Sequence, residues 1–219
     1  MNSTGPLIRM GFSPHPRTCK KIGSLSPRNL LKISLFTVII LLLSFHLPLF
    51  ISEINYLVYG PQNREQTIQE ILTVLESHPT GLANVTKEEL AEVIYEEAIQ
   101  YNQDPKFILA LIAIESSFQN WSVSERGAKG LMQVMPYVAE SIAQEIGVEW
   151  SGDDILFNPF LNIKIGIYYL SRLIQDFNHM GLALEAYNYG PTYIKERMGK
   201  KKQIQGHFYH RILSVYQNL

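Results

Sequence analysis

The residue best suited to catalysis in this sequence is an acid that directly follows an apolar segment. Residues 107–114 are all apolar, and Glu115 comes next. A helix without a polar face is normally surrounded by protein, so a carboxyl group at its end is partly removed from water. Desolvation raises the pKa of a carboxyl group and favours the protonated form that a general acid needs near neutral pH. Glu115 is therefore the candidate catalytic residue, although a glutamate at a helix end is more commonly exposed to solvent.

The stretch after Glu115 has the composition of a ligand-contacting turn. Gly127 and Gly130 stand close together, and the run that begins at Gly130 ends in the polar Gln133 before another helix begins at Pro136. Glycine lets the backbone approach a ligand closely because it has no Cβ atom. The sequence therefore predicts a tight, polar-tipped turn that is available to a ligand.

A series of short motifs runs along the chain. They are Glu115-Ser116, Phe118, Ser124, Gly127-Ala128, Gly130-Leu131-Met132-Gln133, Met135-Pro136, Asn158-Pro159, Asn162-Ile163, Gly166, Tyr169-Leu170, Ala186-Tyr187-Asn188 and Gly190. Together these motifs resemble the soluble lytic transglycosylase family, which comprises lysozyme-like enzymes that cut bacterial peptidoglycan. One such motif would be weak evidence, but the motifs occur in the family's order and with its spacing, and they cover roughly residues 90 to 216 of the chain.

The resemblance implies a set of substrate-binding residues. Ser124 matches a serine that forms hydrogen bonds near the catalytic glutamate and the N-acetyl group of the sugar. Gln133 and Met135 match residues that contact the sugar in the cleft. Tyr187 matches a tyrosine that positions the reacting sugar. Asn188 is included among the substrate-binding residues, and we also expect it to anchor the local backbone. An ordinary loop serine and a core tyrosine with its hydroxyl satisfied are the alternatives for Ser124 and Tyr187.

The expected reaction uses a single carboxyl group. Glycosidic cleavage usually needs two carboxylates, yet Glu125, the nearest acid after Glu115, stands beside Arg126 in a loop. The resemblance implies that Glu115 protonates the oxygen between N-acetylmuramic acid and N-acetylglucosamine, then takes the proton of the muramoyl 6-hydroxyl, which closes a 1,6-anhydro ring. Intramolecular attack has an effective concentration of about 10⁵ M or more in good geometries, so no second, water-activating carboxylate is needed.

Two other functions remain open at this point. The domain could be a lysozyme-type muramidase that uses water, in which case digested wall would carry reducing ends in place of anhydro ends. It could also be a non-catalytic wall-binding scaffold, against which the intact residues Glu115, Ser124, Gln133 and Tyr187 argue.

One departure from the family concerns the segment before the last helix. The family commonly has a Glu-Thr pair there, whereas residues 203–209 contain none, and Gln205 stands where the glutamate is expected. This departure affects the outer sugar-binding positions more than the central chemistry. His207 and His210 have a spacing that metal sites use, but no third ligand accompanies them. We therefore expect neither a metal nor a cofactor.

Charge is unevenly distributed along the chain. Residues 1–32 carry six basic residues and no acid, which leaves 13 bases against 20 acids in the remainder, a formal charge of −7. Affinity for phosphate depends on clustered Lys and Arg. An acidic remainder therefore argues against a nucleic-acid partner and leaves the peptidoglycan glycan strand as the expected one.

Residues 33–51 contain no charged residue over 19 positions, which is long enough to cross a bilayer as a helix. A cleaved signal peptide would have a shorter apolar region and small residues at a cleavage site. A buried core helix would not normally follow so basic a flank. The positive-inside rule then places the N-terminus in the cytoplasm and the rest in the periplasm or outside, held to the bacterial inner membrane by a single helix. Cys19 lies on the cytoplasmic side, which leaves the exported part without cysteine.

We expect four parts: a disordered basic tail at 1–32, the transmembrane helix at 33–51, a linker with a short amphipathic helix at 52–85, and a catalytic domain at 86–219. The apolar spacing in the domain is helical, and no convincing strand pattern occurs. The fold class is therefore mainly α, and the resemblance implies the lysozyme-like, goose-type arrangement. Helices are expected at about residues 62–76, 87–101, 105–115, 136–147, 159–178, 182–189, 191–198 and 208–217, with caps at Thr86, Asp104 and Asn158.

Overall fold

The computed structural model of the protein describes residues 61–219. The tail predicted at residues 1–32 and the transmembrane helix predicted at residues 33–51 lie outside the described residues, as does the start of the predicted linker. None of the helices within 61–219 combines the length and the apolar composition needed to cross a membrane.

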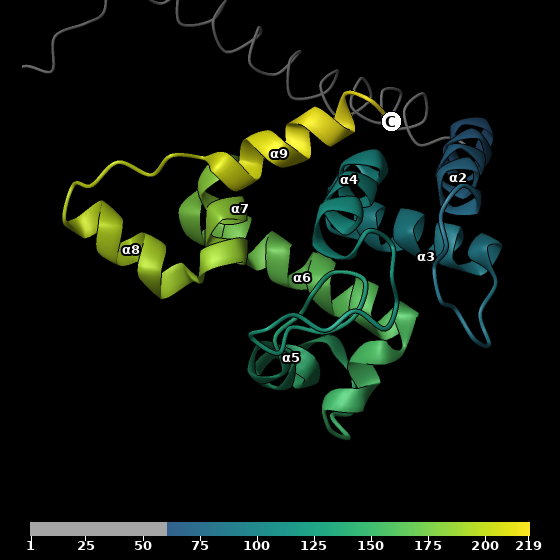
Figure 1. The fold of residues 1–219 in the computed structure, drawn as a ribbon, viewed down its shortest axis with the longest axis horizontal. Helices are drawn as coiled ribbons and strands as arrows, with labels where there is room; N and C mark the ends of the chain where they lie inside the picture. The colour runs from purple at the N-terminus through teal and green to yellow at the C-terminus, as the bar shows by residue number, and fades with distance from the viewer. Residues whose placement is uncertain (1–60) are drawn as a thin grey trace, which may run out of the picture. The chain divides into compact units, whose positions relative to one another are not determined.

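Helices make up the regular structure of residues 61–219, which confirms the mainly α prediction for this part of the chain (Figure 1). Within it, β character is confined to two isolated bridges, which pair Lys129 with Val123 and with Val134. In chain order the elements are α2 (Pro61–Glu76), α3 (Lys87–Gln100), α4 (Pro105–Ser116), α5 (Pro136–Ala143), the 3₁₀ helices η1 (Gln144–Ile146) and η2 (Asp153–Phe157), α6 (Pro159–Phe177), α7 (Met180–Tyr189), α8 (Pro191–Gly199) and α9 (His207–Tyr216).

The buried apolar helix that the sequence predicts is α4. Asp104 caps its N-terminus by accepting a hydrogen bond from the N–H of Lys106 at 2.8 Å, and Pro105 takes the first helical position. The side chains from Ile108 to Ile112 are at most 1% exposed. Fully burying one large aliphatic side chain contributes about 1.5–3 kcal/mol. Packing against α9, α3 and α2 therefore fixes the position of α4 and of the acid at its end.

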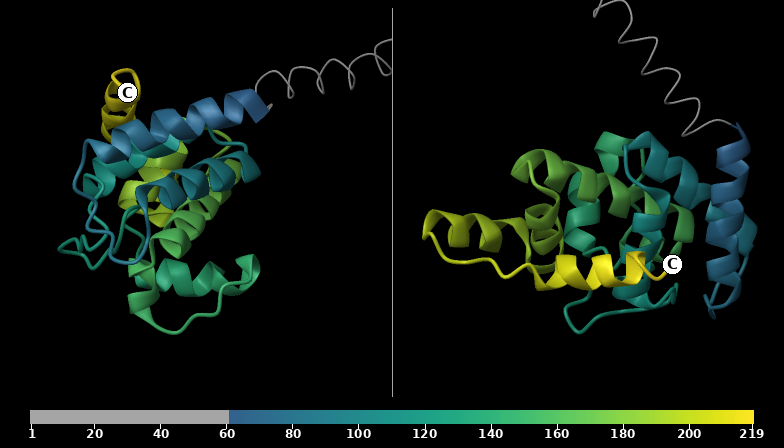
Figure 2. Two further views of the ribbon diagram at one scale, coloured as in Figure 1. Left: turned by 90° about the vertical axis from the view of Figure 1, so that its right-hand side faces the viewer. Right: turned by 90° about the horizontal axis from the view of Figure 1, so that it is seen from above.

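The predicted short amphipathic helix is α2, and it packs into the same core as α3 and α4 (Figure 2). Ile68, Ile71 and Leu75 are at most 4% exposed. On the surface, Arg64 of α2 forms an ion pair with Glu96 of α3 at 2.6 Å. Such an exposed pair contributes little on its own, so apolar burial is what holds α2 in place.

The loop that follows α2 is joined to the segment that follows Glu115. The backbone N–H of Asn120 donates to the carbonyl of Thr80 at 2.9 Å. The indole N–H of Trp121 donates to the carbonyl of Gly81 at 2.7 Å. Two hydrogen bonds thus link residues about forty positions apart, directly beside the end of α4.

Two helix boundaries differ from the sequence prediction. The sequence predicts that residues 179–181 close α6 and that the next helix starts at Leu182, but α6 already ends before Asn178, which takes a left-handed conformation with φ 48°. α7 then starts at Met180, because the ring nitrogen Nδ1 of His179 accepts a hydrogen bond from the N–H of Leu182 at 3.3 Å. The predicted break between the two helices therefore occurs, but it lies at Asn178 and His179, slightly earlier than predicted, and His179 caps α7.

The helix predicted over residues 136–147 is shorter than expected. It is α-helical only as far as Ala143 and continues as the 3₁₀ turn η1, which ends at Gly147 with φ 69°. The segment from 148 to 157, predicted as a loop, contains η2. The remaining helix bounds agree with the prediction to within a residue or two.

Candidate active site

The carboxyl group of Glu115 lies in the last turn of α4 and is partly buried. Desolvation by the surrounding protein raises its pKa from the usual 4.5 to about 8. The positive charge of Arg211 on α9 opposes this shift, since a nearby cation favours the carboxylate. Burial outweighs that charge. Glu115 therefore carries its proton at neutral pH.

Tyr187, from α7, lies near Glu115. Its hydroxyl group donates a hydrogen bond to the backbone carbonyl of Met132 at 2.8 Å. The pKa of Tyr187 is raised well above its usual range, first by burial and then by the charge of Glu115. The ring of Tyr169, from α6, packs 5.4 Å from that of Tyr187, and burial raises the pKa of Tyr169 to about 12. Both tyrosines therefore stay protonated, and their hydroxyl groups can donate hydrogen bonds.

The predicted turn after Glu115 is anchored by Asn162 of α6, which is fully buried. The amide nitrogen of Asn162 donates to the carbonyls of Lys129 and Leu156, each at 2.9 Å, and its amide oxygen accepts from the N–H of Met132 at 2.8 Å. A buried side-chain amide that uses both N–H donors and its oxygen fixes the backbone on both sides of the turn.

Gly130 is required at this turn for two reasons. Its φ of 79° is a left-handed conformation that side chains disfavour, and an added Cβ atom would lie 2.3 Å from the amide nitrogen of Asn162. Gly166 plays a similar part on α6, where a Cβ atom would lie 2.6 Å from the sulfur of Met132. The two glycines let the turn approach α6 closely.

Four of the predicted substrate-binding residues line one cavity of about 130 Å³. They are Gln133 and Met135 from the turn and Tyr187 and Asn188 from α7, and Tyr169 lies with them. Gln133 also has a local role, because its side-chain amide donates to the carbonyls of Ser122 and Gly130.

Two predicted site residues do not line this cavity. Glu115 nevertheless lies near the cavity, because the charge of Glu115 affects the pKa of Tyr187, and Tyr187 lines the cavity. Ser124 is exposed, and its hydroxyl oxygen accepts a hydrogen bond from the N–H of Ala128 at 3.0 Å within the turn. In this structure Ser124 closes the turn.

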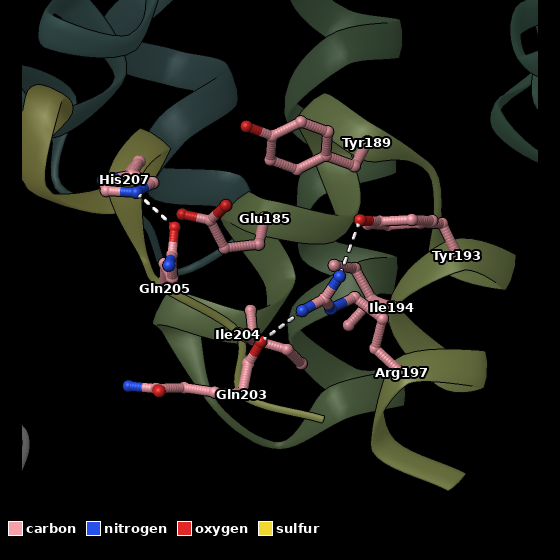
Figure 3. A pocket seen from close by; sticks show the side chains of 9 residues that line it. All are labelled: Glu185, Tyr189, Tyr193, Ile194, Arg197, Gln203, Ile204, Gln205 and His207. Atoms are coloured by element: carbon pink, nitrogen blue, oxygen red, sulfur yellow. Dashed lines mark hydrogen bonds between the residues drawn. The ribbon is translucent and has the colours of Figure 1, made fainter. Parts of the chain in front are cut away.

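The region of Gln205 forms a second cavity between α7, α8 and the segment before α9 (Figure 3). Gln205 lies 2.6 Å from the ring nitrogen Nε2 of His207. Within residues 61–219, no three His, Cys, Asp or Glu side chains are arranged to hold a metal ion.

Sequence reasoning missed the parts played by Tyr169, Asn162 and Glu185. Glu185, on α7, is 3% exposed, and one of its oxygens accepts from the N–H groups of Phe208 and Tyr209. It caps α9, because Gly206 at the N-cap position has no side chain to do so. A polar residue inside an apolar helical stripe was the available signal for Asn162 and Glu185.

Comparison with known proteins gives the family. The model of the transglycosylase SLT domain matches residues 92–207, more than half of the chain. The soluble lytic murein transglycosylase of Salmonella typhimurium is 34% identical over 95 residues, which are 42% of this chain and 15% of that protein. The membrane-bound lytic murein transglycosylase E of Buchnera aphidicola is 30% identical over 122 residues, which are 53% and 55% of the two chains.

Among solved structures, the lytic transglycosylase Slt of Pseudomonas aeruginosa superposes with a TM-score of 0.47 at 24% identity, over 74% of this chain and 26% of that one. The chain spans between about a seventh and just over half of the length of these relatives. Since the family model covers residues from α3 to the start of α9, the chain belongs to the transglycosylase SLT domain family.

Proposed function

We propose that this protein is a peptidoglycan lytic transglycosylase. It cleaves the β-1,4 bond between N-acetylmuramic acid and N-acetylglucosamine and leaves 1,6-anhydromuramic ends. The observation that carries the proposal is Glu115, an acid at the end of an apolar helix whose pKa is raised to about 8. A carboxyl group in that state can donate a proton at neutral pH.

In the first half of the reaction, Glu115 donates its proton to the glycosidic oxygen. The bond from this oxygen to C1 of the muramic acid then breaks, and the N-acetylglucosamine portion leaves with a new hydroxyl group. Positive charge develops at C1, which the oxygen of the sugar's own N-acetyl group can stabilise. The protein thus supplies one proton and no nucleophile.

In the second half, the carboxylate of Glu115 takes the proton from the 6-hydroxyl of the same muramic acid. The O6 oxygen forms a bond to C1 and closes the anhydro ring, so Glu115 returns to its protonated state and no water is consumed. Burial that favours the protonated form also makes the ionised form a stronger base, which suits both steps.

Within residues 61–219, the lining of the first cavity provides no second carboxylate beside Glu115. Gln133, Met135, Tyr187 and Asn188 are proposed to hold the sugar there, and none of the described residues that line this cavity is acidic. Ser124 stays in the proposed set, because it belongs to the same turn and its side chain is exposed.

The products of wall digestion test the proposal. The full chain is incubated with purified peptidoglycan, and the muropeptides are identified by mass spectrometry. Anhydro-ended muropeptides are expected, and their loss is expected for Glu115→Gln, which should keep the fold of the parent. Products with reducing ends would instead indicate a lysozyme-type hydrolase, and an active Glu115→Gln variant would remove the central role of Glu115.

We further propose that residues 33–51 anchor the chain in the inner membrane with the catalytic domain outside the cytoplasm. The support is the uncharged run of 19 residues behind a flank of six bases. A reporter enzyme that is active only after export, fused after Leu219, should be active. Activity of a cytoplasm-only reporter at the same position would overturn this orientation.

A further inference from the structure

The first cavity has one charged side chain among the described residues that line it, and that side chain is Arg126. The rest of the lining is aromatic, apolar or amide, and Tyr189 in this lining also lines the second cavity. Burial keeps the pKa values of Tyr169 and Tyr187 high, so their hydroxyl groups stay neutral and do not offset the guanidinium charge. The lining of the first cavity is therefore positively charged at neutral pH.

The guanidinium group of Arg126 is exposed, and it has no partner in the part of the chain that the structure describes. The exposed guanidinium groups of Arg64 and Arg172, by contrast, each form an ion pair with a glutamate. Glu125 precedes Arg126 in sequence but is not part of the cavity lining. The charge of Arg126 is therefore available to a ligand that enters the cavity.

The turn that carries Arg126 is closed by three hydrogen bonds. The N–H of Gly127 donates to the carbonyl of Ser124, and the N–H of Ser124 donates to the carbonyl of Ala128, each at 2.9 Å. The N–H of Ala128 donates to the hydroxyl of Ser124 at 3.0 Å. These bonds hold the backbone at Arg126 in place beside the cavity.

The chemistry of the guanidinium group indicates which ligand it would recognise. Its planar fork of N–H donors matches the two oxygens of a carboxylate, and it can bind both at once. N-acetylmuramic acid differs from N-acetylglucosamine by a lactyl ether that ends in a carboxyl group. This carboxyl group is free in a bare glycan strand. In the wall it is joined to a peptide, which has carboxylates of its own.

We infer that Arg126 selects glycan strands whose muramic acid carries a carboxylate, either on the lactyl group or on the peptide attached to it. This inference rests on the proposed function, which supplies the muramic acid. The rest of the chain opposes an anionic ligand, because residues 33–219 hold 13 bases against 20 acids. Exposed charges more than about 8 Å apart are largely screened at physiological ionic strength, so a cation inside the cavity can still attract a carboxylate.

Binding of three tetrasaccharides tests the inference without any cleavage. Calorimetric titration uses the full chain carrying Glu115→Gln as the parent. The probes are the neutral tetramer of N-acetylglucosamine, the alternating tetramer of N-acetylglucosamine and N-acetylmuramic acid without peptide, and the same alternating tetramer with L-alanyl-D-glutamate on each lactyl group. An anionic tetramer should bind about fivefold more tightly than the neutral one, the upper end for an exposed ion pair. Adding Arg126→Ala should remove this preference and leave the affinity for the neutral tetramer within about twofold.

The two anionic probes separate the two sources of the carboxylate. A preference for the tetramer without peptide identifies the lactyl carboxylate as the group that Arg126 binds. A preference confined to the tetramer with peptide identifies the carboxylates of the peptide. In either case, raising the salt concentration should reduce the preference, because the contact is electrostatic.

Two further variants separate recognition by the fork from a general effect of charge. Arg126→Lys keeps the charge without the fork and should retain part of the preference. Arg64→Ala removes the same charge from α2, where Arg64 pairs with Glu96, and should leave all three affinities unchanged.

Three results would each overturn the inference. They are equal weakening of all three tetramers by Arg126→Ala, an unchanged preference in that variant, and a parent that binds the anionic tetramers no more tightly than the neutral one. Anhydro products in wall digests would stand in all three cases, so the two proposals fail separately.

Discussion

The hydroxyl group of Tyr187 and the backbone carbonyl of Met132, 55 positions apart in sequence, are joined by a hydrogen bond of 2.8 Å. The bond connects α7 to the turn that follows Glu115. It therefore fixes the distance between the two sides of the first cavity, and the orientation of Tyr187 depends on it.

Removing this hydroxyl should lower activity more than it lowers stability. Tyr187→Phe keeps the ring contact with Tyr169 but loses one hydrogen bond, which costs about 1 kcal/mol of unfolding free energy. We expect turnover of purified peptidoglycan to fall at least tenfold. Tyr168→Phe is the matched control, because it loses a hydroxyl contact with Glu145 away from the cavity. Unchanged turnover in Tyr187→Phe would show that the bond has no part in positioning substrate.

The pH dependence of activity should report the proton on Glu115. Since its pKa is raised to about 8, turnover is expected to fall as the pH rises through about 8. Arg211→Ala removes the charge that lowers this pKa and should move the fall to higher pH. Arg172→Ala removes an exposed guanidinium that pairs with Glu145, and it should leave the profile in place. A shift toward lower pH in Arg211→Ala would contradict the assignment.

Stability should depend on pH through the same group. In the unfolded chain Glu115 ionises near its usual pKa of 4.5, whereas in the folded protein it ionises near 8. The folded state therefore loses stability relative to the unfolded state as the pH rises from about 4.5 to 8. The side chain of Glu115→Gln cannot ionise. The melting temperature of this variant should therefore rise relative to that of the parent as the pH increases from about 4.5 to 8. Parallel curves for the two proteins between pH 4.5 and 8 would mean that Glu115 is not desolvated.

The buried amide of Asn162 should be among the least replaceable side chains. Asn162→Leu leaves the N–H of Met132 and the carbonyl of Leu156 without partners, and it removes one of the two hydrogen bonds to the carbonyl of Lys129, which we expect to cost about 3–5 kcal/mol. Chemical denaturation measures this loss, and Asn84→Leu in an exposed loop is the control. A loss below about 1 kcal/mol would show that water replaces the amide.

Local signals made much of the helical architecture predictable. The caps at Thr86, Asp104 and Asn158 depend on residues within one helical turn, and each occurs as the sequence predicts. The raised pKa of Glu115 was equally predictable, because an unbroken apolar run has to be buried. At His179 the predicted start of the next helix was two residues late, because His179 itself serves as the N-cap of α7.

Contacts between distant segments could not be predicted in the same way. The cap that Glu185 provides to α9 crosses more than twenty residues, and nothing near Phe208 indicates it. The anchoring of the turn by Asn162 and the shared position of Tyr189 between two cavities depend on how helices pack. The sequence contains these residues, but only the assembled fold brings them into contact.

The carbonyls of Thr80 and Gly81 accept hydrogen bonds from the segment after Glu115, and these contacts have a practical consequence. The family model begins at residue 92, downstream of both acceptors and of α2. A recombinant fragment trimmed to that boundary would lose the first turn of α3, which begins at Lys87. It would also remove the cover that α2 gives to the rest of α3 and release the indole of Trp121. Expression of this domain should start no later than residue 61, since the region that matches the family is shorter than the packed unit that includes α2.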